Sequence, residues 1–172
     1  NMNSMFDGAN SADPDVSGFD TILVTDMSSM FWNAQAFNGD LSHWDVGAVT
    51  NMHSLFKSAN VFNGDISNWN VSSVTSMASM FEDAFVFNSD LSSWNVSSVK
   101  SMKLMFNRSY SFESDLSRWD VSAVTDMYGM FQKATSFRGD LTSWNVFNVT
   151  NHDYFRPSSL VIEPFWDQQP QG

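Results

Sequence analysis

Hydrophobic and polar positions repeat along this chain at a fixed interval of 25 residues, with no insertion or deletion up to about residue 156. Each unit, such as 66–90, carries one tryptophan, two phenylalanines, one or two methionines and two valines among Ser, Asn and Asp. One unit is too short to bury these side chains, whereas stacked copies cover one another and form a continuous core. The period therefore predicts a solenoid. Its most specific column is Trp44, Trp69, Trp94, Trp119 and Trp144, with Phe19 one unit earlier, and all 11 methionines fall in two further columns.

The spacing inside a unit predicts a short strand followed by a short helix. Trp94 and Val96 lie two residues apart, so both point inward from a strand while Ser93, Asn95 and Ser97 point outward. The spacing of Leu91, Trp94, Val96 and Val99 matches the strand half of a leucine-rich repeat, and Val99, Met102, Met105, Phe106 and Ser109 match a helical face. An alternative register places the strand on 90–92; the first is favoured because it buries Trp and Val by alternation. The predicted fold class is α/β, a leucine-rich-repeat-like solenoid with one strand and one helix per 25-residue coil.

The regularity of the units predicts a single solenoid domain. Residues 1–26 form a degenerate first unit, which is either a cap or a truncated repeat. Five regular units occupy 27–150. Residues 151–172 start a half repeat and continue into a tail whose apolar residues (160–162, 165 and 166) are expected to cap the last coil, and 168–172 are expected to fray.

The motif F-N-x-D-[LI]-S-x-W-[DN]-V-S-x-V-T-x-M-x-x-M-F-x-x-A covers nearly all of residues 2–156. It resembles the BspA-type surface-protein repeat, a divergent relative of leucine-rich repeats. The resemblance implies a curved α/β solenoid used in adhesion or protein binding at a cell surface. It implies no enzyme activity and no cofactor.

Charge narrows the choice of partners. The net charge is −11, and the eight Lys and Arg are scattered, so no basic stripe is expected to meet nucleic acid or an anionic membrane. No apolar run reaches the ~20 residues that a membrane span needs, so direct membrane insertion is not expected either. The chain has no cysteine, which excludes disulfides and thiolate chemistry but does not fix the compartment. The sequence starts inside a repeat, so any signal or anchor is expected to lie outside it.

The outward residues of the predicted strands form a polar, predicted concave face that is the first candidate binding site. Its middle column is entirely Asp or Asn, and an amide ladder there could be purely structural. The functional interpretation is an array of donors and acceptors for a polar partner, with His43 and Arg118 as the least repeat-like members. The candidate residues are His43, Asp45, Asn68, Asn70, Ser93, Asn95, Arg118, Asp120, Ser143 and Asn145.

A second candidate is the acidic column that precedes each strand. We favour an Asx turn that closes each coil over a calcium ladder, because calcium needs six to eight oxygens and the Gly-rich turns that supply them elsewhere are missing. The column is Asp40, Asp65, Asp90, Asp115 and Asp140, with Asp15 one unit earlier.

Two smaller features complete the candidates. The turn residues Phe85, Val86 and Tyr110 lie outside the core columns and are interpreted as surface filler rather than as an anchor for a partner. Sequons occur at Asn70, Asn95, Asn107 and Asn148, and they are glycan acceptors only in a secreted eukaryotic protein.

No catalytic arrangement is expected, because His43, His53 and His152 occupy different columns and the repeated carboxylates supply no unique acid and base. The leading hypothesis is a non-enzymatic interaction or adhesion module, extracellular or on a cell surface, that binds a protein or a glycan. The alternatives are a structural subunit that self-associates through the solenoid ends, and a calcium- or ice-binding surface protein.

Overall fold

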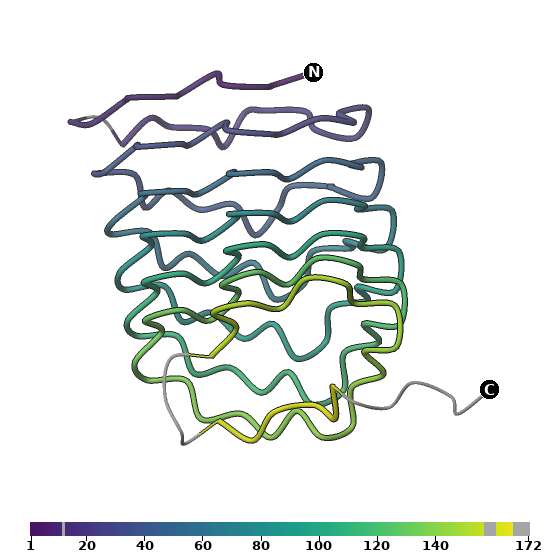
Figure 1. The fold of residues 1–172 in the computed structure, drawn as a ribbon. Helices are drawn as coiled ribbons and strands as arrows, with labels where there is room; N and C mark the ends of the chain where they lie inside the picture. Colours follow the sequence, from purple (N-terminus) through teal and green to yellow (C-terminus); the bar gives the residue numbers. More distant parts are fainter. Residues whose placement is uncertain (12, 157–160, 167–172) are drawn as a thin grey trace.

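The computed structural model shows a stack of coils that advance along one axis, with the first and the last described residues near opposite ends of the stack (Figure 1). The structure describes residues 1–11, 13–156 and 161–166. Each coil crosses one side of the molecule and returns along the other (Figure 1). We call the first the methionine side, formed by 2–10, 27–35, 52–60, 77–85, 102–110 and 127–135. The second is the tryptophan side, formed by 13–23, 38–48, 63–73, 88–98, 113–123 and 138–148.

The predicted helix and strand of each coil are both wrong. Within the described ranges the chain forms no helix and no strand, only turns and isolated parallel bridges. The protein is therefore not an α/β solenoid of the leucine-rich-repeat kind. The bridges join equivalent positions of successive coils, Asp26–Asn51, Asn51–Ser76, Ser76–Ser101, Ser101–Asp126 and Asp126–Asn151, and one more joins Asp140 to Ile162.

Successive turns replace the helix on the methionine side. In one coil the Met80 N–H donates to the Met77 carbonyl and the Ala84 N–H to the Phe81 carbonyl, three residues back in each case. The third residue of each turn has a positive φ, 56° at Ser79 and 59° at Asp83, which is the pattern of a type II turn. Because a right-handed helix needs negative φ throughout, these two positions exclude it. They recur in the other coils at Ser4, Ser29, Ser54, Leu104, Gly129 and Tyr154, and at Gly8, Asn33, Ser58, Arg108 and Lys133.

The close spacing of the coils is the physical reason for turns rather than helices. Packed helices would hold neighbouring coils about 8–10 Å apart. Here every second N–H of the methionine side donates to the next coil at 2.7–3.1 Å, as Met77, Ser79, Phe81 and Asp83 donate to Ser101, Lys103, Met105 and Asn107. The stacked rings of Phe31, Phe56, Phe81, Phe106 and Phe131 lie 5.6–5.8 Å apart from one coil to the next.

The predicted core columns are confirmed by burial. Each regular coil buries its tryptophan, both phenylalanines, the methionine or leucine positions and the valines, apart from Val149, which is only partly buried. Outward positions such as Ser93 and Asn95 are exposed between the buried Trp94 and Val96. The predicted inward and outward alternation is thus correct, although turns closed by the Trp94 and Val99 N–H groups produce it instead of a strand.

The tryptophans join the coils on their side of the molecule. Each indole N–H donates to the carbonyl 28 residues earlier, at 2.9–3.4 Å from Trp44 to Trp144. Asn38, Asn63 and Asn88 form a second ladder, in which each side-chain oxygen accepts the backbone N–H of the next coil at 2.8–2.9 Å. Side chains therefore make the contacts between coils here that the backbone makes on the methionine side.

Part of the predicted C-terminal cap is described. Val161 is buried and the Ile162 N–H donates to the Gly139 carbonyl, so this segment continues the stack. Trp166 stacks on His152 with ring centroids 4.1 Å apart, while Phe165 and Ile162 are exposed. Leu160 and the predicted frayed residues 168–172 lie outside the described residues. No helix in the described part of the chain has the length and hydropathy to span a membrane.

Candidate functional site

The candidate polar face lies on the tryptophan side, and all ten of its predicted residues are exposed. Ser93 and Arg118 line a groove of about 540 Å³ together with Asp90, Glu113 and Asp115. A second hollow of about 440 Å³ lies beside it, between Asp115, Asp140 and Ser143. The structure therefore brings part of the predicted set together around the Arg118 guanidinium.

The side-chain oxygens in the middle column of this face already accept hydrogen bonds from the protein's own backbone. The side-chain oxygens of Asp45, Asn70, Asn95, Asp120 and Asn145 each accept the N–H two residues later at 2.9–3.2 Å. This is an Asx turn, so the column is structural, although not through the stacked amides that were considered from the sequence. These residues therefore have fewer free hydrogen-bond acceptors to offer a partner than their exposure alone indicates.

The outer column differs from coil to coil. The hydroxyls of Ser93 and Ser143 donate to carbonyls of the preceding coil, at 3.0 and 2.6 Å. Within the described ranges, the side chains of His43, Asn68 and Arg118 make no hydrogen bond. His43 and Arg118, singled out from the sequence, are thus exposed ionisable side chains of the face that have no hydrogen-bond partner within the described residues.

The acidic column closes the coils, as predicted. Oδ1 of Asp40, Asp65, Asp90, Asp115 and Asp140 accepts the N–H two residues later at 2.9–3.0 Å. For Asp65, the hydroxyl and then the backbone N–H of Ser67 hold the pKa of the carboxyl below its ordinary value, against the neighbouring carboxylates, which raise it. In the part of the chain that the structure describes, no group of three or more His, Asp or Glu side chains could hold a metal ion.

The four sequons differ in the exposure and the hydrogen bonds of their Asn side chains. Asn107 is buried and its amide donates to Gln132 at 3.0 Å. The Asn148 amide donates to the Ser122 carbonyl at 2.7 Å. Asn70 and Asn95 are exposed, and their bonds to Ser72 and Ser97 use the side-chain oxygen, not the amide nitrogen to which a glycan attaches.

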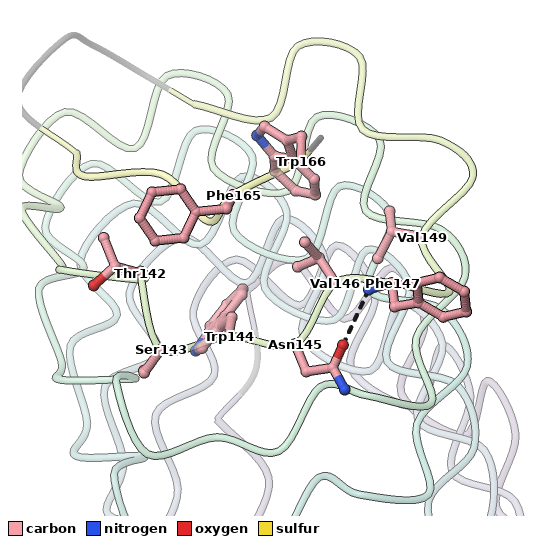
Figure 2. A pocket seen from close by; sticks show the side chains of 9 residues that line it. All are labelled: Thr142, Ser143, Trp144, Asn145, Val146, Phe147, Val149, Phe165 and Trp166. Atoms are coloured by element: carbon pink, nitrogen blue, oxygen red, sulfur yellow. Dashed lines mark hydrogen bonds between the residues drawn. The ribbon is translucent and has the colours of Figure 1, made fainter. Parts of the chain in front are cut away.

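A hollow of about 320 Å³ lies where residues 161–166 cover only part of the last regular coil. Figure 2 shows Phe165 and Trp166 above the segment from Thr142 to Val149, with the Asn145 oxygen turned to the Phe147 N–H. The Thr142 hydroxyl is likewise bonded, to Asp140 at 2.7 Å. The hollow is therefore an incompletely covered section of the core whose main polar side chains already have partners.

Sequence reasoning missed the outward residues of the methionine side. Lys57 pairs with Glu82 at 2.9 Å and Arg108 with Asp83 at 3.2 Å. Trp32 is exposed, and Lys57 Nζ lies 5.9 Å from its ring. The sequence does mark these positions, because the outward columns of this side change residue type in nearly every unit while the core columns repeat. The predicted helix hid them, because it distributes the same positions around its circumference instead of on one surface. The columns are Ser28, His53, Ala78, Lys103, Tyr128; Trp32, Lys57, Glu82, Asn107, Gln132; and Gln35, Asn60, Phe85, Tyr110, Thr135.

These features define a class: a repeat protein whose stacked, turn-built coils carry two different polar surfaces. The family model described as "Mycoplasma protein of unknown function, DUF285" matches residues 1–107 and 71–159. The chain belongs to this family. No curated protein and no solved structure matches it.

Proposed function

We propose that this protein is a non-enzymatic interaction module, extracellular or on a cell surface, which presents the polar face to a protein or glycan partner. The observation that carries the proposal is the groove beside Arg118, where an exposed guanidinium lies among Asp90, Glu113 and Asp115. A groove of this kind fits a partner with both acidic groups and hydroxyls. The resemblance of the W-[DN]-V and M-x-x-M-F motifs to BspA-type surface repeats supports the same proposal and the same location.

A glycan array and a pull-down with surface proteins of host or neighbouring cells test this proposal. The wild type is compared with the double variant His43→Ala/Arg118→Ala, and Lys100→Ala serves as the control because it removes an exposed charge that lies outside the polar face. We expect the double variant to bind about tenfold more weakly, since removing an interface charge mainly alters association and its salt dependence. Unchanged binding by the double variant rejects the chosen residues, and the absence of any bound glycan or protein rejects the module.

A second candidate function is a structural subunit that joins others at the ends of the stack. The direction of the hydrogen bonds between coils favours it, because the methionine side always donates toward the C-terminal coil. Within the described residues, the carbonyls of Asn3, Met5 and Asp7 accept no backbone N–H, and the N–H groups of His152 and Tyr154 donate to no carbonyl. The two ends are therefore complementary, for a further repeat or for a second copy. Size-exclusion chromatography with light scattering, and electron microscopy, test it: monomers alone at all concentrations reject the assembly.

No structural observation favours the calcium- or ice-binding alternative, since Oδ1 of each carboxylate in the acidic column already serves its turn. A melting temperature that rises with millimolar calcium would revive the ion ladder, because an ion that binds the native state must stabilise it.

A further inference from the structure

A cluster of cationic and aromatic side chains lies on the methionine side, across the coils between residues 85 and 133. We call it the basic–aromatic patch and define it as Phe85, Lys103, Arg108, Tyr110, Tyr128 and Lys133. From the sequence, Phe85 and Tyr110 were interpreted as surface filler, and nothing connected them to the cations. In the folded chain Phe85 lies beside Tyr110, Lys103 beside Tyr128 and Arg108 beside Lys133, because residues 25 apart lie side by side in successive coils.

Three contacts between neighbouring coils lie within the patch. Lys103 Nζ lies 5.5 Å from the centroid of the Tyr128 ring, a cation–π contact. The Phe85 and Tyr110 rings stack with centroids 5.3 Å apart. The Arg108 N–H donates to the Gln132 carbonyl at 2.8 Å, which places Lys133 next to Arg108.

The centre of the patch also has an apolar floor. Leu104 is only partly buried, and a Cβ built on Gly129 would come within 2.7 Å of its Cδ2. Glycine at 129 therefore leaves the space that the Leu104 side chain occupies against the next coil. Leu104 and Gly129 replace the Ser that four earlier units have in this column.

The charge of the patch is opposite to that of the molecule as a whole. It holds three of the eight Lys and Arg of a chain whose net charge is −11. Two carboxylates border the patch: Asp83 is paired with Arg108, and Asp126 Oδ1 accepts the Tyr128 N–H at 3.0 Å. The acidic column lies on the other side of the coils. Lys103 and Lys133 are exposed, and neither forms an ion pair within the described ranges.

We propose that the basic–aromatic patch binds an acidic segment of a protein partner. Carboxylates of the partner pair with Lys103 and Lys133, and an apolar side chain packs against the edge of the Phe85–Tyr110 pair. Tyr and Arg are among the residues that dominate binding energy at protein interfaces, and charge complementarity selects the partner and speeds its association.

A protein segment fits this surface better than a polyanion or a sugar. A nucleic acid or a sulfated glycan carries uniform negative charge, and the acidic remainder of the molecule would repel its length. The stacked Phe85 and Tyr110 each cover one face of the other, so they do not form an open platform for a sugar ring or a base. A short segment with a few carboxylates and one apolar residue avoids both problems.

Selection of peptides tests the inference with the full chain. A random dodecapeptide phage library is panned on immobilised protein, and the selected peptides are synthesised with a fluorescein label for polarisation measurements. We expect selection of peptides that combine Asp or Glu with a bulky apolar residue, and affinity that falls as salt is raised. Replacing their Asp and Glu by Asn and Gln should weaken binding at least about tenfold.

Matched variants locate the binding surface. Lys103→Glu/Lys133→Glu should weaken binding by about tenfold or more, and Tyr110→Ser should weaken it to a similar degree. Arg118→Glu is the control, because it reverses a charge in a neighbouring coil but on the tryptophan side, and its affinity should stay within about twofold. Melting temperatures close to that of the wild type verify that each variant is folded.

Three results would overturn the inference: no selected peptide, selected peptides without acidic residues, or full affinity in the Lys103→Glu/Lys133→Glu variant. Loss of binding in Arg118→Glu alone would also overturn it, and would support the polar face of the proposed function instead. The two proposals can therefore fail separately.

Discussion

The two sides of each coil are joined to the next coil by different means. On the methionine side the backbone forms the ladder, with four N–H groups per coil, such as those of Met77, Ser79, Phe81 and Asp83, bonded to the next coil. On the tryptophan side no backbone–backbone bond joins the described coils before the pairing of Leu141 and Ile162. There the indole N–H, the Asn side-chain oxygen and Ser hydroxyls make the connection.

This difference explains which positions can vary. Where the backbone forms the ladder, outward side chains are not needed for stacking, and the methionine side carries His, Lys, Glu, Trp, Tyr and Ala in equivalent places. Where side chains form the ladder, every regular unit keeps the Trp whose indole joins it to the preceding coil. Asn occupies the second ladder only at 38, 63 and 88, and Glu113 and Arg138 follow it. A surface that can change without loss of the fold is suited to acquire a specific partner, and the methionine side, which carries the basic–aromatic patch, is such a surface.

Truncating a central tryptophan should have the largest effect. Trp94→Ala removes a buried ring and the indole bond to the Ile66 carbonyl, which measures 3.1 Å, and should lower the free energy of unfolding by about 3–5 kcal/mol. Trp94→Phe keeps an aromatic ring but leaves the carbonyl without its donor, and should cost about 1–3 kcal/mol. Urea denaturation followed by circular dichroism measures both. Equal losses for the two variants would show that the indole N–H, and not the ring, provides the stability.

The left-handed turns of the methionine side should give the next effect. Ser79 has a φ of 56° and is buried, and valine tolerates that conformation poorly. Ser79→Val should therefore cost about 1–3 kcal/mol. Ser79→Gly is the matched control, because Gly129 occupies the equivalent place with a φ of 59°, and it should stay close to the wild type in the same denaturation experiment. If Ser79→Val left the free energy of unfolding unchanged, it would contradict the turn structure and make a helix possible again.

The asparagine ladder tests the comparison directly. Asn63→Leu removes the oxygen that accepts the Asn88 N–H at 2.8 Å and should cost about 1 kcal/mol. Lys133→Ser changes an exposed outward residue of the methionine side, at a position where Ser58 has the same left-handed backbone, and should change stability by less than about 0.5 kcal/mol. If the two substitutions cost the same in chemical denaturation, side chains do not join the coils on the tryptophan side in the way described.

Low pH should lower the free energy of unfolding by less per residue than the substitutions above, because the carboxylates of the tryptophan side are exposed to water. The Ser67 hydroxyl and N–H lower the pKa of Asp65 below its ordinary 3.8, and Ser92 and Ser117 act in the same way on the pKa of Asp90 and Asp115. A carboxyl whose pKa is lower in the folded state stabilises it above the unfolded pKa, and this contribution is lost as the pH falls through the folded value. The melting temperature should therefore drop below about pH 4. The triple variant Asp65→Asn/Asp90→Asn/Asp115→Asn keeps the turn acceptors and should lose part of this drop; an unaltered pH profile would contradict the role of these carboxylates.

The helix was predicted because spacings of three and four residues between Met102, Met105, Phe106 and Ser109 fit a helical face. A run of three-residue turns that is bonded to its neighbours produces the same spacing of buried positions. The signal that separates the two is a small or polar residue at both left-handed positions, as at Ser79 and Asp83. Leu104 and Arg108 hide this signal in one unit, because the neighbouring coils impose the conformation there.

The candidate site was predictable in part. His43 and Arg118 were singled out because they break the repeat, and the structure leaves both open to a partner on an exposed face. The middle column could not be judged from sequence, since an exposed Asn or Asp looks the same whether it is free or caps a turn. The basic–aromatic patch was out of reach, because it joins Phe85 to residues up to 133 across neighbouring coils.

The sequence by itself determined the repeat, its 25-residue period, the composition of the core and the acidic turns, because burial of apolar columns and Asx capping depend on local spacing. The tertiary structure alone decided the backbone conformation and which residues of neighbouring coils lie side by side on the surface. Every second N–H group of the methionine side finds its acceptor one coil away, and a bond to the next coil has no signature in the local pattern of any single unit.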